Sequence, residues 1–575
     1  MGAATPAGGP VSVWRPRRRL LAPLPPGGSV AAGWLRCGRE TPVRSAGLAT
    51  PRAGPGWPAQ PHRSILAAGH SAALASVTAP EFIIERRQRI GLFAGPVLLV
   101  ALLLLAPPAG MSLPAWRTAA VGIFMACWWI SEAIPIPATA LTPLLLFPLL
   151  GILPIGPTAA PYANPIIFLF LGGFVIALAM ERHNLHRRIA LRVVRAVGVH
   201  PPVLILGFML ATAFMSMWVS NTATVVMMLP IGLSVVRLVD PEVGDGPMEI
   251  NFAIALMLGI AYAASIGGLA TLIGTPPNAL LAAFMRETYD VEIGFAQWML
   301  IGLPLVIVAL PVTWVVLTRL VFPIRIREIP GGAEAIRREY EKLGPVSRAE
   351  RSVAVIFVVT ALLWITRPLL DPYLPGLSDT SIAIAAALAT FIVPVSLRHG
   401  EFLMDWETAE RLPWGVLLLF GGGLALAGAI TTTGLAGWIG EQMTALQSWP
   451  LLLTIMLVTA IIIFLTELTS NTATAAAFLP LVASLALGIG ENPFVLLVPA
   501  ALAASCAFML PVATPPNAIV YGSGHVTVPQ MARAGIWLNL LFIALISLTV
   551  YTLVLLAFGV EIGSVPDWTA AAMGG

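Results

Sequence analysis

Residues 220–224 read Ser-Asn-Thr-Ala-Thr, and the same five residues return at 470–474. Each copy is a short polar segment inside a long apolar run. A second matched pair follows, with Gly-Thr-Pro-Pro-Asn-Ala at 274–279 and Ala-Thr-Pro-Pro-Asn-Ala at 513–518. The chain therefore carries the same pair of polar motifs twice, and the rest of the sequence is expected to position the two copies.

The composition predicts a membrane protein. Hydrophobic residues make up 58% of the sequence and charged residues 10%, whereas about a quarter of the residues in a soluble domain are charged. We expect an all-α polytopic membrane protein with about eleven transmembrane helices and two re-entrant hairpins in an inverted repeat. The net charge of +4 does not indicate nucleic acid binding, because nine arginines and one acidic residue fall within residues 1–80.

Four regions are expected along the chain. The first is rich in Arg, Pro and Gly and lacks a long apolar run, so it cannot bury enough surface to offset its ordering entropy. The regions are a disordered extension at 1–85, a first transmembrane helix at 86–112, a first inverted repeat at 113–345 with a hairpin at 201–239, and a second inverted repeat at 346–575 with a hairpin at 449–489.

Eleven apolar segments are long enough to cross a bilayer as a helix, which takes about 20 residues. They are 90–107, 114–133, 137–153, 163–181, 250–286, 296–322, 351–369, 379–397, 412–431, 492–524 and 534–559. Two of them, 250–286 and 492–524, contain Thr-Pro-Pro-Asn well inside the run. Because proline removes a backbone donor and clashes with the preceding turn, both helices are predicted to be unwound there.

The positive-inside rule decides how the segment 201–239 crosses. The Arg-rich loops at 182–195 and 319–351 are both assigned to the cytoplasm, so an even number of crossings must separate them. Two full spans already lie between the loops, and 201–239 is therefore predicted to be a re-entrant hairpin. The same parity places the N-terminus in the cytoplasm and inverts the second half, so that the two hairpin tips meet near the midplane.

A broken helix in a membrane is tolerated only where its freed backbone groups line a cavity or bind something. Ser, Asn and Thr are N-cap residues, so each tip is expected to start a helix whose positive end faces the cavity and attracts an anion. Thr275 and Thr514 are expected to cap two more helices, with proline at the first helical position. The two halves together would present four helix starts to one site.

The predicted site contains no Arg or Lys to balance an anion of charge −2. Freed carbonyl groups and side-chain oxygens near the tips would form cages suited to a small cation such as sodium, which prefers hard oxygen ligands. The side chains in these cages are Ser216, Ser220 and Asn221 in the first half and Thr466 and Asn471 in the second. An internal repeat with broken helices in both halves indicates a secondary transporter.

Two other classes were weighed against a transporter. An intramembrane enzyme would require a His-Glu-x-x-His, Gly-x-Ser-x-Gly or paired-Asp arrangement at membrane depth, and the sequence contains none. A channel is less compatible with sealed hairpins than alternating access is. Among intramembrane acidic residues, Glu467 is interpreted as a hydrogen-bonding residue of the hairpin and Glu181 as interfacial.

The chain from about Trp128 to Val520 resembles the divalent-anion/sodium symporter family, which transports dicarboxylates, citrate or sulfate. The resemblance rests on Trp-Trp-Ile-Ser-Glu-Ala-Ile-Pro at 128–135, on both Ser-Asn-Thr tips, and on Ala504, Ser505, Phe508, Pro511, Val512, Ala513, Asn517 and Val520. It implies eleven spans, two hairpins, a homodimer in the membrane lipid and an elevator-like movement.

The resemblance also implies which residues bind sodium and substrate. The first sodium site would be Ser216, Ser220, Asn221 and Gly274, and the second Thr466, Thr469, Asn471 and Ala513. The substrate carboxylates would meet Asn221, Thr222, Ser470, Asn471 and Thr472, with Thr275 and Thr514 nearby.

The expected activity is sodium-coupled symport of a small divalent anion, with a C4-dicarboxylate such as succinate, malate or fumarate as the first choice. A sodium:sulfate or citrate symporter and a dicarboxylate exchanger stay open as alternatives. Exchanger relatives carry a basic side chain in place of a cation, and residues 466–474 contain none, which favours symport. The expected location is the bacterial inner membrane.

Overall fold

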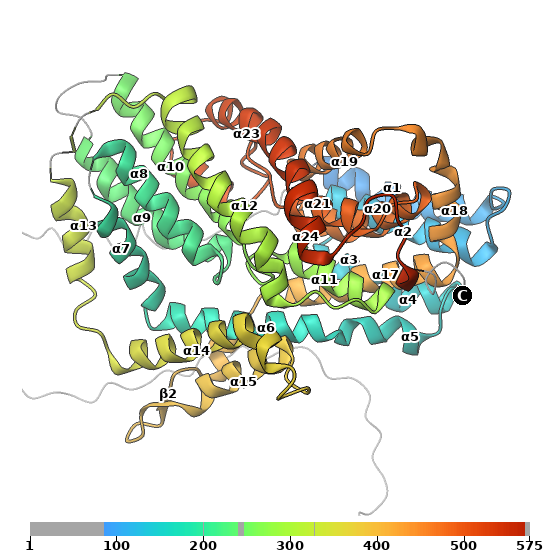
Figure 1. Ribbon diagram of the computed structural model, residues 1–575, viewed down its shortest axis with the longest axis horizontal. Helices are drawn as coiled ribbons and strands as arrows, with labels where there is room; N and C mark the ends of the chain where they lie inside the picture. The colour runs from blue at the N-terminus through green and yellow to red at the C-terminus, as the bar shows by residue number, and fades with distance from the viewer. Residues whose placement is uncertain (1–85, 199, 240–246, 327, 330, 570–575) are drawn as a thin grey trace, which may run out of the picture. The chain divides into compact units, whose positions relative to one another are not determined.

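A computed structural model describes residues 86–569, apart from residues 199, 240–246, 327 and 330 (Figure 1). The predicted disordered extension, residues 1–85, lies outside the described residues. Within the described part the chain is almost entirely helical. Nine of its helices are long and apolar enough to cross a membrane, and five shorter apolar helices accompany them. These helices support a multi-pass membrane protein, while the predicted number of eleven spans stays a prediction.

The first half of the described chain contains both halves of the first hairpin and both halves of the first broken helix. Its elements are α1 (Arg86–Leu104), α2 (Leu113–Ser131), α3 (Ile136–Thr139), α4 (Thr142–Leu149), α5 (Ile155–Ala159), the 3-10 helix η1 (Ala160–Ala163), α6 (Pro165–Arg182), α7 (Leu185–Val197), α8 (Pro201–Ser216), α9 (Asn221–Val239), α10 (Pro247–Gly268), α11 (Pro276–Tyr289), α12 (Phe295–Val315), the π-helix η2 (Val316–Val321) and α13 (Gly332–Glu341).

The second half follows a corresponding order. Its elements are α14 (Arg348–Leu370), α15 (Asp379–Ile392), β1 (Pro394–Ser396), β2 (Glu401–Phe402), α16 (Trp406–Ala409), α17 (Trp414–Thr432), α18 (Leu435–Gln442), the 3-10 helix η3 (Thr444–Ser448), α19 (Leu451–Thr466), α20 (Asn471–Gly488), α21 (Phe494–Ala503), α22 (Pro515–Tyr521), α23 (Val528–Thr549), the π-helix η4 (Val550–Val554), α24 (Leu555–Phe558) and the 3-10 helix η5 (Asp567–Thr569).

Local signals in the sequence set several helix ends. Ser112 caps α2 by accepting a hydrogen bond from the backbone N–H of Ala115, and Asn164 caps α6 by accepting from that of Ile166. Ser347 and Glu350 form a reciprocal capping box at the start of α14. These caps fix the entry points of the long helices that enclose the hairpins.

The predicted span 379–397 is too long at its end. Helix α15 stops at Ile392, and residues Pro394–Ser396 form a strand that pairs antiparallel with Glu401–Phe402. The physical reason is Pro394, because the residue before a proline avoids the helical conformation and proline has no N–H to continue the helix. Val393 is accordingly extended, with φ −75° and ψ 117°.

Both Pro-containing long runs are unwound, as predicted. The first interruption covers 269–275, between α10 and α11, and the second covers 504–514, between α21 and α22. The second interruption extends far upstream of Thr-Pro-Pro-Asn, which the motif alone did not predict. The division into repeats at 113–345 and 346–575, and their inversion across the membrane, stay predictions.

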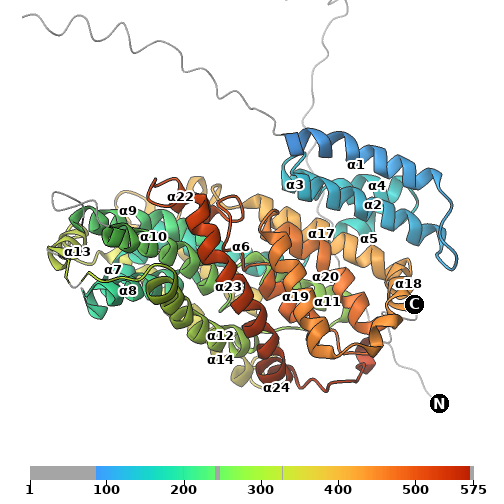
Figure 2. The same cartoon turned by 90° about the horizontal axis from the view of Figure 1, so that it is seen from above.

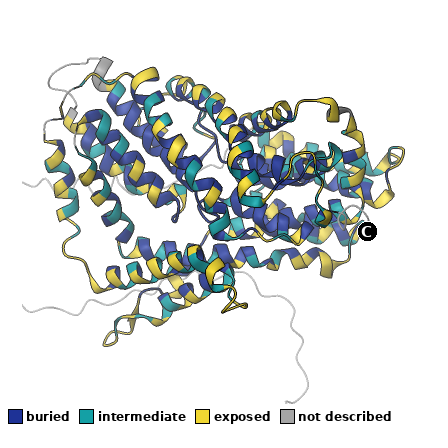
Figure 3. Ribbon diagram, viewed as in Figure 1, coloured by how far each residue is buried: buried dark blue, intermediate teal, exposed yellow. Residues whose placement is uncertain are grey.

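The helices of this one compact unit can be divided into two groups, which also pack on each other through α17 with α11 and α20. The carrier group contains the hairpins, the broken helices and the long helices that follow them, namely α8–α12 and α19–α24. The frame group contains α1–α6, α14, α15 and α17, in which α15 packs against α6 and α1 lies along α2 (Figure 2). Helices α7, α13 and α18 follow in sequence between members of the two groups. Figure 3 shows that α10, in the carrier group, is largely buried, whereas α14, in the frame group, is largely exposed.

Glycines allow close helix contact at several of these interfaces. A Cβ on Gly172 would lie 2.7 Å from backbone atoms of Ala383 in α15, and one on Gly267 of α10 would lie 2.3 Å from the carbonyl oxygen of Ala213 in α8. The first hairpin therefore rests directly on the backbone of the first broken helix.

We predict that Gly267→Ala destabilises the protein by about 1–3 kcal/mol, because the added methyl group must push α8 away from α10. The measurement is the midpoint of thermal unfolding in detergent. Gly428→Ala in α17 is the matched control, since its Cβ would meet nothing within 4 Å, and it should leave the midpoint unchanged or raise it. Equal midpoints for both variants would contradict the prediction.

Candidate functional site

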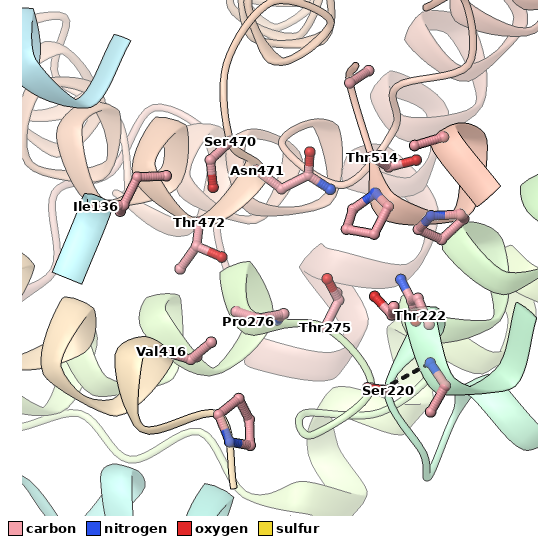
Figure 4. A pocket seen from close by; sticks show the side chains of 18 of the residues that line it. Ile136, Ser220, Thr222, Thr275, Pro276, Val416, Ser470, Asn471, Thr472 and Thr514 are labelled. Carbon is pink, nitrogen blue, oxygen red and sulfur yellow. Dashed lines mark hydrogen bonds between the residues drawn. The ribbon is translucent and has the colours of Figure 1, made fainter. Parts of the chain in front are cut away.

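The two Ser-Asn-Thr tips line one cavity of about 760 Å³ (Figure 4). The predicted site residues on its wall are Ser220, Asn221, Thr222, Gly274, Thr275, Thr469, Ser470, Asn471, Thr472, Ala513 and Thr514. The other two, Ser216 and Thr466, are fully buried and make hydrogen bonds to the wall residues Asn221 and Asn471. The structure thus brings together side chains that are 250 positions apart in the sequence.

Four helices begin at this cavity. Helix α9 begins at Asn221, α11 at Pro276, α20 at Asn471 and α22 at Pro515, and each of these residues lines the cavity. The first N–H groups of a helix have no partner within the helix and carry a partial positive charge, so the starts of α9 and α20 suit the cavity to an anion. Helices α11 and α22 each begin with two prolines, which have no N–H, so these two ends contribute only the positive end of the helix dipole.

The capping prediction is confirmed for two of the four hydroxyls, those of Ser220 and Thr514, and is wrong for Ser470 and Thr275, whose side chains make no cap hydrogen bond. The Oγ of Ser220 accepts a hydrogen bond from the N–H of Ala223 at 3.2 Å, and Thr514 Oγ1 accepts from that of Asn517 at 3.3 Å. Thr275 makes no cap hydrogen bond. Its hydroxyl instead lies 3.1 Å from the hydroxyl of Ser505.

The contact between Thr275 and Ser505 links the two broken helices across the center of the carrier group. A second link is the hydroxyl of Tyr262 in α10, which donates to the carbonyl oxygen of Phe508 at 2.6 Å. The sequence predicted neither contact, because each partner lies in the other half of the chain. These links fix the two interruptions relative to each other.

The first predicted cation cage is compact. The Ser216 hydroxyl bridges the side-chain oxygen of Asn221 at 2.5 Å and the carbonyl oxygen of Ala264 at 2.7 Å. A Cβ added to Gly268 would lie 2.9 Å from the Asn221 side-chain oxygen and 3.0 Å from the carbonyl oxygen of Gly274, so both oxygens lie close to the backbone of Gly268. Hydroxyl, amide and carbonyl oxygens therefore converge, and this donor set fits a hard cation such as sodium.

The second cage repeats the arrangement. The Thr466 hydroxyl bridges the side-chain oxygen of Asn471 at 2.8 Å and the carbonyl oxygen of Ala504 at 2.9 Å. The hydroxyl of Thr469 donates to the Leu465 carbonyl at 3.0 Å and lies 2.6 Å from the hydroxyl of Thr474.

An asparagine organises each interruption. The side-chain amide of Asn278 donates to the carbonyl oxygens of Gly268 at 3.1 Å and Thr271 at 2.9 Å. In the second half, the amide of Asn517 donates to those of Ala507 and Leu510, both at 3.1 Å. The asparagines of the two Thr-Pro-Pro-Asn motifs therefore satisfy carbonyl groups that the unwound helix cannot pair.

Glu467 has the structural hydrogen-bonding role expected for it. Its buried carboxylate accepts from the backbone N–H groups of residues 508, 509 and 510, at distances of 2.7 to 3.1 Å, and from the side-chain amide of Asn539 at 2.8 Å. The first half has Met217 at the corresponding position and no such carboxylate. Glu467 therefore explains why the second interruption begins so far upstream of its prolines.

The prediction of a site without basic residues needs correction. Arg87 and Arg411 line the cavity, together with the acidic residues Glu132 and Glu181. Arg87 pairs with Glu132 at 3.3 Å, in a half-exposed position. The polar tips themselves contain no cation, as expected. Arg87 comes from α1 and Arg411 from the segment just before α17, and no sequence signal connected them to tips that are far away in the chain.

We predict that Glu467→Gln lowers the free energy of unfolding by about 1–3 kcal/mol, because an amide donor would face backbone N–H donors that now bind a carboxylate oxygen. Thermal unfolding in detergent measures the effect. The control is Glu407→Gln, an exposed position on α16, which should change stability by less than about 0.5 kcal/mol. A Glu467→Gln protein as stable as the control would show that the carboxylate is dispensable.

Comparisons with known proteins agree with this architecture. Residues 87–558 match the family described as the sodium:sulfate symporter transmembrane region. The chain is 45% identical over 482 residues to the sodium-dependent dicarboxylate transporter SdcS of Staphylococcus saprophyticus, covering 83% of this chain and 93% of the relative. The corresponding protein of Staphylococcus aureus strain USA300 is 44% identical over the same shares.

Two solved structures resemble the fold at low sequence identity. The YdaH transporter of Alcanivorax borkumensis is 13% identical with a TM-score of 0.52, and the alignment covers 78% of this chain and 99% of that one. MtrF of Neisseria gonorrhoeae is 12% identical with a TM-score of 0.50, over 81% of this chain and 100% of that one. These two likenesses concern the fold alone. With the family match covering most of the described residues and relatives at 44–45% identity, the chain belongs to the sodium:sulfate symporter family.

Proposed function

We propose that this chain is a sodium-coupled symporter of a small C4-dicarboxylate such as succinate, malate or fumarate. Family membership makes it a membrane transporter rather than an enzyme and makes Na⁺ its coupling ion. The observation that carries the substrate class is the single cavity, which four helix starts and both tips surround. Relatives at 44–45% identity are named sodium-dependent dicarboxylate transporters.

The two tips on the cavity wall support an anion with a charge at each end. The tips approach the cavity from two different halves of the chain, and each offers an amide and hydroxyls. One carboxylate would meet Asn221 and Thr222, with Thr275 nearby. The other would meet Ser470, Asn471 and Thr472, with Thr514 nearby. Sulfate and citrate are the alternatives, because the same donors also bind their oxygens.

Sodium ions would occupy the two oxygen cages beside the tips. The first would use Ser216, Ser220, Asn221 and Gly274, and the second Thr466, Thr469, Asn471 and Ala513. Each asparagine belongs to a cage and also faces the cavity, so a cation in the cage would order the group that receives the carboxylate. The absence of a basic side chain from residues 466–474 favours symport over dicarboxylate exchange.

We further propose that the carrier group moves against the frame group in an elevator-like step. The cavity lies at the interface of the two groups, since Phe170 and Val416 of the frame group line it together with the tips. Sliding of the carrier group would carry the bound ions and anion past this wall. A homodimer held through the frame, a bacterial inner membrane location and a cytoplasmic N-terminus belong to the same proposal.

The direct test is uptake of labelled succinate into proteoliposomes. An inward sodium gradient should drive uptake, whereas a potassium gradient should not, and unlabelled malate and fumarate should compete better than citrate or sulfate. Trans-stimulation by internal succinate without sodium would instead identify an exchanger. Uptake of labelled succinate, citrate and sulfate at the same rates with and without a sodium gradient would refute the proposal.

We predict that Thr466→Ala raises the sodium concentration for half-maximal uptake about tenfold, because the variant loses a hydroxyl that organises the second cage. Sodium titrations of succinate uptake measure the shift. Ser484→Ala is the matched control, since this buried hydroxyl donates to the Pro480 carbonyl of its own helix at 3.0 Å and does not line the cavity. The cage assignment would be wrong if both variants required the same sodium concentration.

A further inference from the structure

A cluster of charged side chains joins the frame group to the carrier group outside the cavity. Arg367 lies in the last turn of α14, and Asp379 is the first residue of α15, so both belong to the frame group. Glu292 lies in the loop between α11 and α12 of the carrier group. Arg367 Nη1 lies 2.6 Å from Glu292 Oε1 and 3.6 Å from Asp379 Oδ2.

Two further polar contacts cross the same interface. Asp379 Oδ2 accepts a hydrogen bond at 2.7 Å from the backbone N–H of Phe295, the first residue of α12. The side-chain amide of Asn164, which caps α6, donates to Glu287 Oε2 in α11 at 2.9 Å. The carrier segment 287–295 is therefore fastened to three different frame helices.

The frame side of the cluster is held in place independently of the carrier group. Arg367 Nε donates to the carbonyl oxygen of Leu377 at 3.1 Å, and the indole N–H of Trp364 donates to that of Asp379 at 3.0 Å. All of these groups belong to α14, α15 or the segment between them. Arg367 and Asp379 would thus stay together if the carrier group moved away.

Each charge in the cluster has a second partner within its own group. Arg286 of α11 lies 3.8 Å from Glu292 Oε2, and Asp379 lies 3.6 Å from Arg367. Both distances are longer than the 2.6 Å between Arg367 and Glu292. If the interface opened, Arg367 could approach Asp379 and Glu292 could approach Arg286. No charged side chain would then be left without a partner, and the free-energy cost of an unpaired charge would be avoided.

The polar contacts matter here because the apolar walls do not close this part of the interface. The cluster lines a groove of about 770 Å³ between α12 and the end of α14. Two aromatic contacts accompany it, the stack of Phe295 on Trp364, with ring centroids 4.5 Å apart, and the edge contact of Trp218 with Phe357 of α14, with centroids 5.0 Å apart. The charged side chains therefore add to an aromatic attachment at this end.

We propose that Glu292, Arg367 and Asp379 form a latch that holds the carrier group in the position seen here, and that Arg286 receives Glu292 when the latch opens. The inference rests on the proposed movement of the carrier group. An exchange of partners lets the protein favour one conformer without a large penalty in the other, as a two-state transporter requires. Arg286 and Arg367 thus compete for one carboxylate and bias the equilibrium in opposite directions.

The test uses a cysteine in the cavity wall of the carrier group. Val512 lines the cavity and is 68% exposed, and in an elevator movement it would face opposite sides of the membrane in the two conformers. Val512→Cys is made with Cys37 and Cys127 replaced by alanine. A membrane-impermeant maleimide is then applied to sealed vesicles of each orientation, which gives one fast and one slow labelling rate. The slow rate is proportional to the population of the other conformer.

We expect Glu292→Gln to raise the slow rate up to about fivefold, because the pair that it loses in this conformer, with the more buried Arg367, is stronger than the pair with the exposed Arg286 that it loses in the other. Arg286→Gln should not raise it, because it weakens only the alternative partner of Glu292. The control Arg337→Gln, at an exposed pair with Glu341 on α13, should leave both rates unchanged. An unchanged slow rate in Glu292→Gln, or an equal rise in Arg286→Gln, would overturn the latch.

Folding and function are monitored separately. Cys506 is fully buried and stays in all variants, so its labelling reports unfolding. If Glu292→Gln labels there, Glu292→Asp replaces it, because the shorter carboxylate lengthens the pair with Arg367 and should raise the slow rate less. Labelling requires no transport, so loss of sodium-dependent uptake by the parent protein would refute the proposed function, whereas the labelling rates alone decide the latch.

Discussion

The structure depends on one constraint, which is that a helix interrupted inside an apolar region must find partners for its freed backbone groups. Here the four interruptions converge on one cavity. Helices α9 and α20 begin there with backbone N–H groups, whereas freed carbonyl groups accept hydrogen bonds from Asn278 and Asn517 and from the hydroxyls of Ser216 and Thr466. An anion and small cations are the chemical complements of these two kinds of backbone group. The same unpaired backbone groups that the fold must satisfy are therefore the groups available to bind ligands.

The two halves satisfy the freed backbone groups with corresponding residues, but the neighbouring side chains differ between the halves. Ser216 and Thr466 make equivalent pairs of hydrogen bonds. Only the second half adds a buried carboxylate, Glu467, which holds three successive backbone N–H groups. The second interruption is accordingly longer than the first. Similar sequence motifs thus give similar hydrogen-bonding arrangements at Ser216 and Thr466, but only the second has a carboxylate nearby.

The interface between frame and carrier groups combines apolar contact with a small number of polar attachments. Close glycine contacts occur within the groups, as at Gly267 against Ala213 in the carrier group and Gly172 against Ala383 in the frame group, and also between them, where a Cβ on Gly423 of α17 would lie 3.0 Å from the Cβ of Ala476 in α20. The charged cluster around Arg367 joins the groups at another place.

The sequence by itself determined the class of protein, the position of both tips, the unwinding at each Thr-Pro-Pro-Asn and most of the residues that line the cavity, because these follow from hydropathy, helix-capping chemistry and an internal repeat. Only the tertiary structure decided that Arg87 and Arg411 share the cavity wall, that Thr275 bonds Ser505 instead of capping its helix, and that α15 ends early against a strand. The reason is physical: capping and helix breaking act over a few residues, whereas these contacts join side chains that only the packing of distant helices brings within hydrogen-bonding distance.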